Sequence, residues 1–146
     1  MKKFIDSSVF VYAYLKPRRK LTEKEKRVKV LAKEIVSRLE RGELEVIMTV
    51  VHLSEILNIL EDRLNLQTSL SFLELVLASE NIEIVPVTLH DYQAALEIAR
   101  RYAVSANDAV AYIKMCEMKI GEIYTFDKHF RNFEKIKVVP EPHEYE

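Results

Sequence analysis

Residues 3–15, KFIDSSVFVYAYL, set a pattern that recurs along the chain. Residues 3–5 are β-prone and end at Asp6, and residues 9–15 form an apolar, aromatic run that is too long to be a loop without a turn signal. We therefore predict a strand, an acidic residue at its carboxyl end, and then a helix.

Capping signals and apolar periodicity predict the remaining elements. Thr22 with Glu25, and Thr88 with Asp91, have the spacing of a capping box, in which two side chains bond the free amides at the start of a helix. Helices are predicted at residues 9–15, 22–41, 50–62 and 67–79, from residue 88 onward, and at 105–118. Strands are predicted at residues 3–5, 44–48, 82–87, 122–126 and 136–139.

This order predicts an α/β fold. Strands that recur between helices need crossover connections, which place helices on both faces of a mainly parallel sheet. A single core usually organises about 100–150 residues, and the sequence has no linker, repeat or low-complexity segment. We therefore expect one domain spanning residues 1–146.

The composition excludes several classes of protein. With only two glycines, Gly42 and Gly121, the chain cannot form a Walker loop, a GxGxxG turn or a GxSxG elbow. The lone Cys116 excludes an internal disulfide framework and favours a reducing cytoplasm. The longest stretch without a charged residue, 64–73, is far shorter than the roughly 18 apolar residues of a membrane helix. The net charge of -1 gives the whole molecule no attraction to nucleic acid.

Four acidic residues are expected at one edge of the sheet. Asp6 and Asp127 each follow a predicted strand, and the carboxyl ends of strands form the ligand crevice of open α/β sheets. Glu55 lies in the first turns of the helix after residues 44–48, and Asp108 opens the helix at 105–118, so both helix starts are expected at that edge.

Taken singly, most of these carboxylates have a structural explanation. Asp6 is also a plausible helix cap, Asp127 a turn residue, and Asp108 a partner of Ser105 in a capping box. Glu55 is harder to explain, because a carboxylate on so apolar a helix costs desolvation energy unless it is paired. Coincidence of all four at one edge favours a functional site.

Converging carboxylates repel one another, so they must take up protons or bind cations. Oxygen ligands without His or Cys select hard ions such as Mg²⁺ or Mn²⁺. With such ions the expected chemistry is phosphoryl transfer on a phosphodiester or phosphomonoester. The spacing of His52 and Glu55 leaves zinc as a weaker alternative.

Four motifs carry a family resemblance: Phe4-Ile-Asp6-Ser-Ser8-Val, Leu53-Ser-Glu55-Ile-Leu, Asn107-Asp108-Ala-Val-Ala and Thr125-Phe-Asp127-Lys-His-Phe. In this order and spacing they resemble the PIN domain family of metal-dependent ribonucleases, and most of all its short VapC-type toxins. The resemblance implies a three-layer sandwich with a five-stranded parallel sheet, and cleavage of single-stranded RNA by water activated by Mg²⁺ or Mn²⁺.

The resemblance also implies roles for individual residues. Asp6, Glu55 and Asp108 would be the main metal ligands, and Asp127 an additional or water-mediated one. Ser8 and Thr125 would support the site.

A small antitoxin protein and a homodimer are further expectations. Residues 9–15 and 22–41 could form the groove for the antitoxin, or be core or a dimer surface. An RNA-maturation or decay nuclease without an antitoxin, and a non-catalytic RNA-binding module, remain the alternatives.

The segment of residues 16–29 is strongly basic, with eight basic and two acidic residues, net 8 − 2 = +6. It could hold RNA phosphates beside the acidic crevice through Arg18, Arg19 and Lys20. The alternative is a solvated helix face laced with Glu–Lys pairs.

Overall fold

The computed structural model describes residues 1–146 and contains five strands and six α-helices in the predicted order. The strands are β1 (Lys3–Ile5), β2 (Val46–Thr49), β3 (Ile82–Val85), β4 (Glu122–Tyr124) and β5 (Lys137–Val139). The helices are α1 (Ser7–Tyr14), α2 (Glu23–Glu40), α3 (Val50–Arg63), α4 (Leu66–Ala78), α5 (Leu89–Tyr102) and α6 (Ala106–Met118). Two 3₁₀ helices follow, η1 (Lys128–Asn132) and η2 (Pro142–Glu144).

All five strands join one parallel sheet in the order β3-β2-β1-β4-β5, which confirms the predicted fold class. β1 is the central strand, and its Phe4 pairs with Ile47 on one side and Ile123 on the other. Because every strand pairs in parallel with its neighbours, all the carboxyl ends lie at one edge of the sheet.

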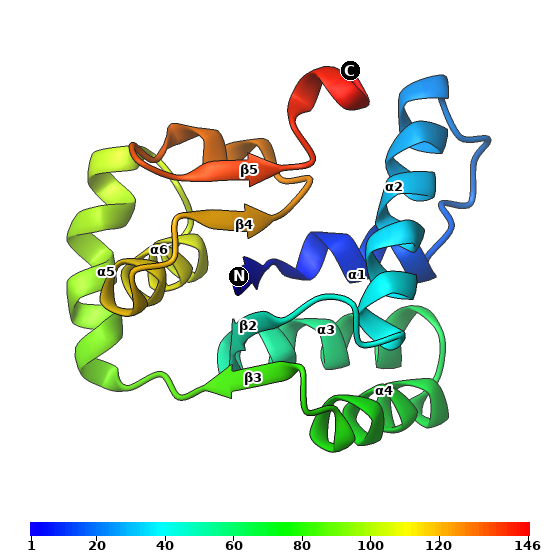
Figure 1. Ribbon diagram of the computed structural model, residues 1–146, viewed down its shortest axis with the longest axis horizontal. Coiled ribbons are helices and arrows are strands. Elements are labelled where there is room, and N and C mark those ends of the chain that lie inside the picture. The colour runs from blue at the N-terminus through cyan, green and yellow to red at the C-terminus, as the bar shows by residue number, and fades with distance from the viewer.

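Alternating side chains of the strands build two cores, one on each face of the sheet. Ile5, with its neighbours Val46 and Met48 on β2, belongs to the larger cluster, which α1, α2, α3 and α4 cover. Phe4 and Ile47 point to the opposite face and pack with residues of α6 and η1. This period of two is the geometry of a strand, and it confirms the three layers. Figure 1 shows α5 and α6 on one side of the sheet, with α1, α2 and α4 on the other.

Helix starts are fixed by the predicted caps. Thr22 and Thr88 each form a reciprocal capping box, with Glu25 and Asp91 respectively. Thr49 caps α3 by accepting hydrogen bonds from the amides of Val51 and His52. These contacts set where α2, α5 and α3 begin, and so where the side chains of their first turns project.

Two strands are shorter than predicted, and one capping box is incomplete. The strand predicted at 82–87 ends at Val85, immediately before Pro86, which has no amide hydrogen to donate to a neighbour. The strand predicted at 122–126 ends at Tyr124, and the hydroxyl of the next residue, Thr125, donates to Asp6 after the end of β1. Ser105 accepts a hydrogen bond from the Asp108 amide, but the reciprocal bond of a capping box is missing. None of the helices has the length and hydropathy of a membrane span.

Candidate active site

The structure brings the four predicted carboxylates into one pocket at the carboxyl edge of the sheet. Asp6, Glu55, Asp108 and Asp127 all line a cavity of about 370 Å³. They arrive from four elements: the end of β1, the first turns of α3, the start of α6 and the loop after β4. Their convergence is therefore a product of the parallel sheet and of the helices that return to its edge.

Two hydroxyl groups join the end of β1 to the loop after β4. The Thr125 hydroxyl donates to Asp6 Oδ2 at 2.9 Å and accepts the amide of Asp127 at 3.0 Å. Because that hydroxyl hydrogen is already used, Ser8 donates to Thr125 across their 3.3 Å contact. Ser8 Oγ also accepts the amide of Phe126 at 3.0 Å. Ser8 and Thr125 thus connect Asp6 to the loop that carries Asp127. Their supporting role in the site stays a prediction.

Asp6 and Asp127 also act as caps, so the structural explanations hold for them as well. Asp6 is only 4% exposed and accepts the Ser8 amide at the start of α1. Asp127 accepts the amide of His129 at 2.9 Å at the start of η1. Each carboxylate therefore has one oxygen tied to the backbone, which orients the remaining oxygen.

Glu55 has a partner that the sequence did not single out. The side-chain amide of Asn107 donates to Glu55 Oε2 at 3.0 Å, and the hydroxyl of Tyr92 donates to Asn107 Oδ1 at 2.7 Å. Asn107 stands beside Asp108 within a motif, but its spacing gave no sign of a bond to α3. This contact explains how a carboxylate is accommodated on an apolar helix.

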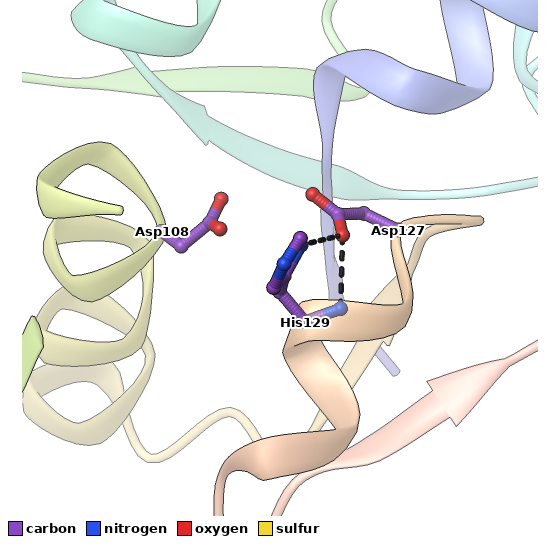
Figure 2. A group of neighbouring side chains, drawn as sticks. All are labelled: Asp108, Asp127 and His129. Carbon is purple, nitrogen blue, oxygen red and sulfur yellow. Dashed lines mark hydrogen bonds and ion pairs between the residues drawn. The ribbon is translucent and has the colours of Figure 1, made fainter. Parts of the chain in front are cut away.

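A histidine also lies at the site. His129 Nδ1 contacts Asp127 Oδ1 at 2.7 Å, and one ligand atom from each of Asp108, Asp127 and His129 lies within 4.8 Å of the others. Figure 2 shows Asp108 projecting from α6 toward the Asp127–His129 pair. The sequence did not single out His129, although its position two residues after Asp127 could have indicated it.

Comparison with known proteins bears on this arrangement. A family model described as the PIN domain matches residues 3–136. The chain belongs to the PIN domain family. A search of curated protein sequences found no significant match.

Among solved structures, the fold of this PIN domain is similar to that of Mycobacterium tuberculosis VapC20, described as a sarcin-ricin loop cleaving toxin. The TM-score is 0.67 at 20% identity, and the match covers 92% of this chain and 98% of VapC20. At that identity the likeness concerns the fold.

Asp108 of this PIN domain lies in surroundings that disfavour its charged form. Burial, together with the neighbouring carboxylates of Asp127 and Asp6, raises the pKa of Asp108 from 3.8 to about 6. The ionised form of Asp108 therefore raises the free energy of the folded protein unless a cation binds beside it, and protonation removes the charge.

The donor atoms of the pocket fit a divalent cation. Carboxylate oxygens from four elements face a shared cavity, which is the ligand chemistry of hard cations. The sequence predicted a site lined by oxygen ligands alone. The structure corrects this, because His129 also lines the pocket. Its Nδ1 contacts Asp127, so only Nε2 is left for a ligand. Asp6 and Glu55 line the same pocket but do not belong to the group whose ligand atoms lie within 4.8 Å of one another. The metal-site role of the four acids stays a prediction.

His52 lies buried against this site on the inner side of α3. The Thr49 oxygen already accepts two amides, so its hydroxyl donates to His52 Nδ1 at 2.7 Å and the ring proton sits on Nε2. His52 Nε2 is buried without a partner. Burial lowers the pKa of His52, although the Asp6 and Glu55 carboxylates oppose that change. His52 does not line the acidic pocket and is only 1% exposed, so it is part of the packed support beneath the site.

The basic segment lies beside the acidic pocket, but much of its charge is paired. Arg19 forms a two-pronged ion pair with Glu25 at 2.7 and 2.9 Å, as the solvated-face alternative anticipated. Lys29 donates to the carbonyls of Tyr12 and Leu15. Arg18 and Lys20, by contrast, are exposed and make no side-chain hydrogen bond. Only part of the segment is available to a ligand.

The surface expected for a groove is mostly core. The inner faces of α1 and α2 pack together in the larger cluster. What remains open is a pocket of about 380 Å³ that adjoins the acidic pocket by sharing Ser7 and Ser8. Its other lining residues are Val11, Tyr12, Leu15, Pro17, Leu21, Glu25, Lys29 and Arg63.

Proposed function

We propose that this PIN domain is a metal-dependent endoribonuclease that cleaves single-stranded RNA with its acidic quartet, and that it is the toxin of a toxin–antitoxin pair. The observation that carries the nuclease proposal is the convergence of Asp6, Glu55, Asp108 and Asp127 in one pocket. Carboxylates gathered in one pocket repel one another and favour a bound cation, and a phosphodiester is a substrate on which such cations act.

In this proposal Asp6, Glu55 and Asp108 hold Mg²⁺ or Mn²⁺, and Asp127 acts directly or through water. When bound, the cation lowers the pKa of a water molecule and neutralises charge on the scissile phosphate. Thr125 and Ser8 keep Asp6 in place. Asp127 accepts the His129 amide, which fixes one of its oxygens before a cation binds.

We propose that the bound RNA strand extends from the acidic pocket into the adjoining pocket. The shared Ser7 and Ser8 make a continuous path, and Arg63 and Lys29 supply positive charge along it. Arg18 and Lys20 have side chains free for phosphates, whereas Arg19 must first release Glu25. We therefore retain Arg18 and Lys20 as the main cationic contacts of the basic segment.

The toxin assignment rests on the family resemblance and on the fold shared with VapC20, which is itself described as a sarcin-ricin loop cleaving toxin. A small antitoxin would restrain the nuclease by placing a basic side chain among the carboxylates, a charge-assisted contact that is strong in a partly dry site. We place the nuclease in the cytoplasm, where RNA is present and where the reducing conditions keep the free Cys116 as a thiol.

A homodimer is supported by leucines on the outer face of α4. Leu66, Leu70 and Leu77 are 56%, 53% and 71% exposed, and this spacing forms a single stripe along a helix. Light scattering of the purified chain tests this assembly, with Leu70→Glu expected to yield monomers. A monomeric wild-type chain contradicts it.

The decisive experiment is an RNA-cutting assay on mixed single-stranded RNAs with Mg²⁺, Mn²⁺ or excess EDTA. Asp6→Asn, Glu55→Gln and Asp108→Asn should each greatly reduce cutting while leaving the circular dichroism spectrum unchanged. Asp62→Asn is the matched control, because Asp62 is exposed on α3 and lies outside the pocket. Cutting that persists in EDTA, or in all three pocket variants, contradicts the proposal.

Purification from the native host separates the toxin from the alternatives. A toxin should stop growth when expressed alone and should co-purify with a small protein that blocks cutting. A chain that is harmless, cuts one defined precursor and has no such inhibitor is a maturation or decay nuclease. A chain that binds RNA without cutting it is a binding module.

A further inference from the structure

Glu55 is held in the pocket by a single side chain from another helix. Asp6 and Asp127 each accept a main-chain amide, and the Ser105 hydroxyl fixes the first turn of the helix that carries Asp108. Glu55 has the longest side chain of the four, and its one hydrogen-bond partner is the side-chain amide of Asn107 at 3.0 Å. The position of the Glu55 carboxylate therefore depends on Asn107.

Tyr92 decides which end of the Asn107 amide faces Glu55. An asparagine presents an acceptor oxygen on one side and a donor nitrogen on the other. The Tyr92 hydroxyl donates to the oxygen at 2.7 Å, which leaves the nitrogen turned toward Glu55 Oε2. If the amide rotated by half a turn, its oxygen would meet the carboxylate and repel it. The chain Tyr92–Asn107–Glu55 thus links α5, α6 and α3.

The bond to Asn107 also selects the oxygen that Glu55 offers to the pocket. Oε2 is occupied by the amide, and Oε1 has no hydrogen-bond partner in the protein. Glu55 and Asn107 are both half-buried, so this contact is partly shielded from water and orders the side chain more than a surface contact would. Holding a ligand in its binding geometry before the cation arrives removes part of the entropic cost of binding.

We propose that Asn107 and Tyr92 are positioning residues that hold Glu55 ready for the cation, an inference that rests on the proposed function. Outer partners of metal ligands commonly change metal affinity about 10–100-fold when they are removed. Asn107→Ala should therefore weaken Mn²⁺ binding at least about 10-fold. Tyr92→Phe, which removes one hydroxyl and leaves Asn107 in place, should give a smaller loss in the same direction.

The test is a calorimetric titration of Mn²⁺ into the full metal-free chain, with the RNA-cutting assay run on the same samples. Tyr112→Phe is the matched control, because Tyr112 lies on α6 and stacks on Phe133 away from the pocket. Both Asn107→Ala and Tyr92→Phe should recover cutting when Mn²⁺ is raised, since they change the affinity for the cation and leave its ligands intact. Tyr92→Phe serves if Asn107→Ala does not fold.

A double-variant cycle separates positioning from a general structural effect. In a Glu55→Gln background, Asn107→Ala should change the Mn²⁺ dissociation constant by less than about 2-fold, because the carboxylate it positions is already gone. Equal losses in both backgrounds, or an Asn107→Ala affinity within about 2-fold of wild type, overturn the inference.

Two patterns distinguish this inference from the proposed function. If the wild-type chain binds Mn²⁺ and cuts RNA while both positioning variants match it, the nuclease stands and the positioning role is wrong. If the wild-type chain binds no Mn²⁺, both proposals are wrong.

Discussion

Replacing Asp108 by Asn should stabilise the cation-free protein at neutral pH. Burial and the carboxylates of Asp127 and Asp6 raise the pKa of Asp108 from 3.8 to about 6. That difference corresponds to at most about 3 kcal/mol of native-state destabilisation. Because Asp108 is only half-buried, solvent screening reduces the expected gain to about 1–2 kcal/mol. For a chain of this size, the melting temperature should rise by about 3–6 °C.

The dependence on pH identifies the cause of this gain. Folding raises the pKa of Asp108, so the native state binds more protons than the unfolded chain between pH 3.8 and about 6. Stability therefore falls as the pH rises through that window, and the loss is complete above it. The advantage of Asp108→Asn should be largest at pH 7.5 and fall to about a third of that value at pH 4.5.

Thermal unfolding of both proteins in EDTA at these two pH values provides the measurement. Saturating Mn²⁺ should reduce or reverse the advantage of the variant, because the cation neutralises the repulsion that the substitution relieves. Asp62→Asn, on the exposed face of α3, should leave the melting temperature nearly unchanged. An Asp108→Asn protein that is no more stable at pH 7.5, or that gains equally at both pH values, refutes the reasoning.

Three further outcomes are expected. Thr125→Val should lower the free energy of unfolding, measured in urea, by about 1–3 kcal/mol, because the Asp6 carboxylate and the Asp127 amide each lose a hydrogen bond. Thr125→Ser keeps the hydroxyl and should be destabilised less. Neutralising Arg18 and Lys20 should reduce the slope of log affinity for RNA against log salt concentration by about 0.7 for each lost phosphate contact. An unchanged slope would indicate that the segment is a solvated face that does not contact RNA. Asp127→Asn should reduce cutting less than Asp6→Asn, and the reverse order would show that the ligands are wrongly ranked.

Local signals predicted the elements and the edge at which the carboxylates gather. Asp6 and Asp127 follow strands, and a parallel sheet brings the ends of strands together whatever the details of packing. The capping boxes at Thr22 and Thr88 could also be predicted from the sequence, because the partner of each threonine lies only three residues away. These features depend on short stretches of sequence, and the structure confirms them.

The remaining features depend on partners that are distant in the sequence. The bond from Asn107 to Glu55 spans 52 positions, so neither local motif contains it. The charge of residues 16–29 predicted a cationic surface, but Arg27 donates to the carbonyl of Tyr145 and so ties that segment to the C-terminal residues. Composition counts charges without saying which are already paired.

The central position of β1 has a consequence for the order in which the site can assemble during synthesis. Asp6 leaves the ribosome well before its partner Thr125, which is 119 positions later, and β4 flanks one side of β1. Domains fold as units while synthesis proceeds from the N-terminus. A nascent chain that has not yet produced β4 has an incomplete sheet and lacks Asp127. On the proposed function, cutting therefore begins only after β4 and Asp127 have been synthesised and packed against β1, and products that terminate before them are harmless to the RNA around them.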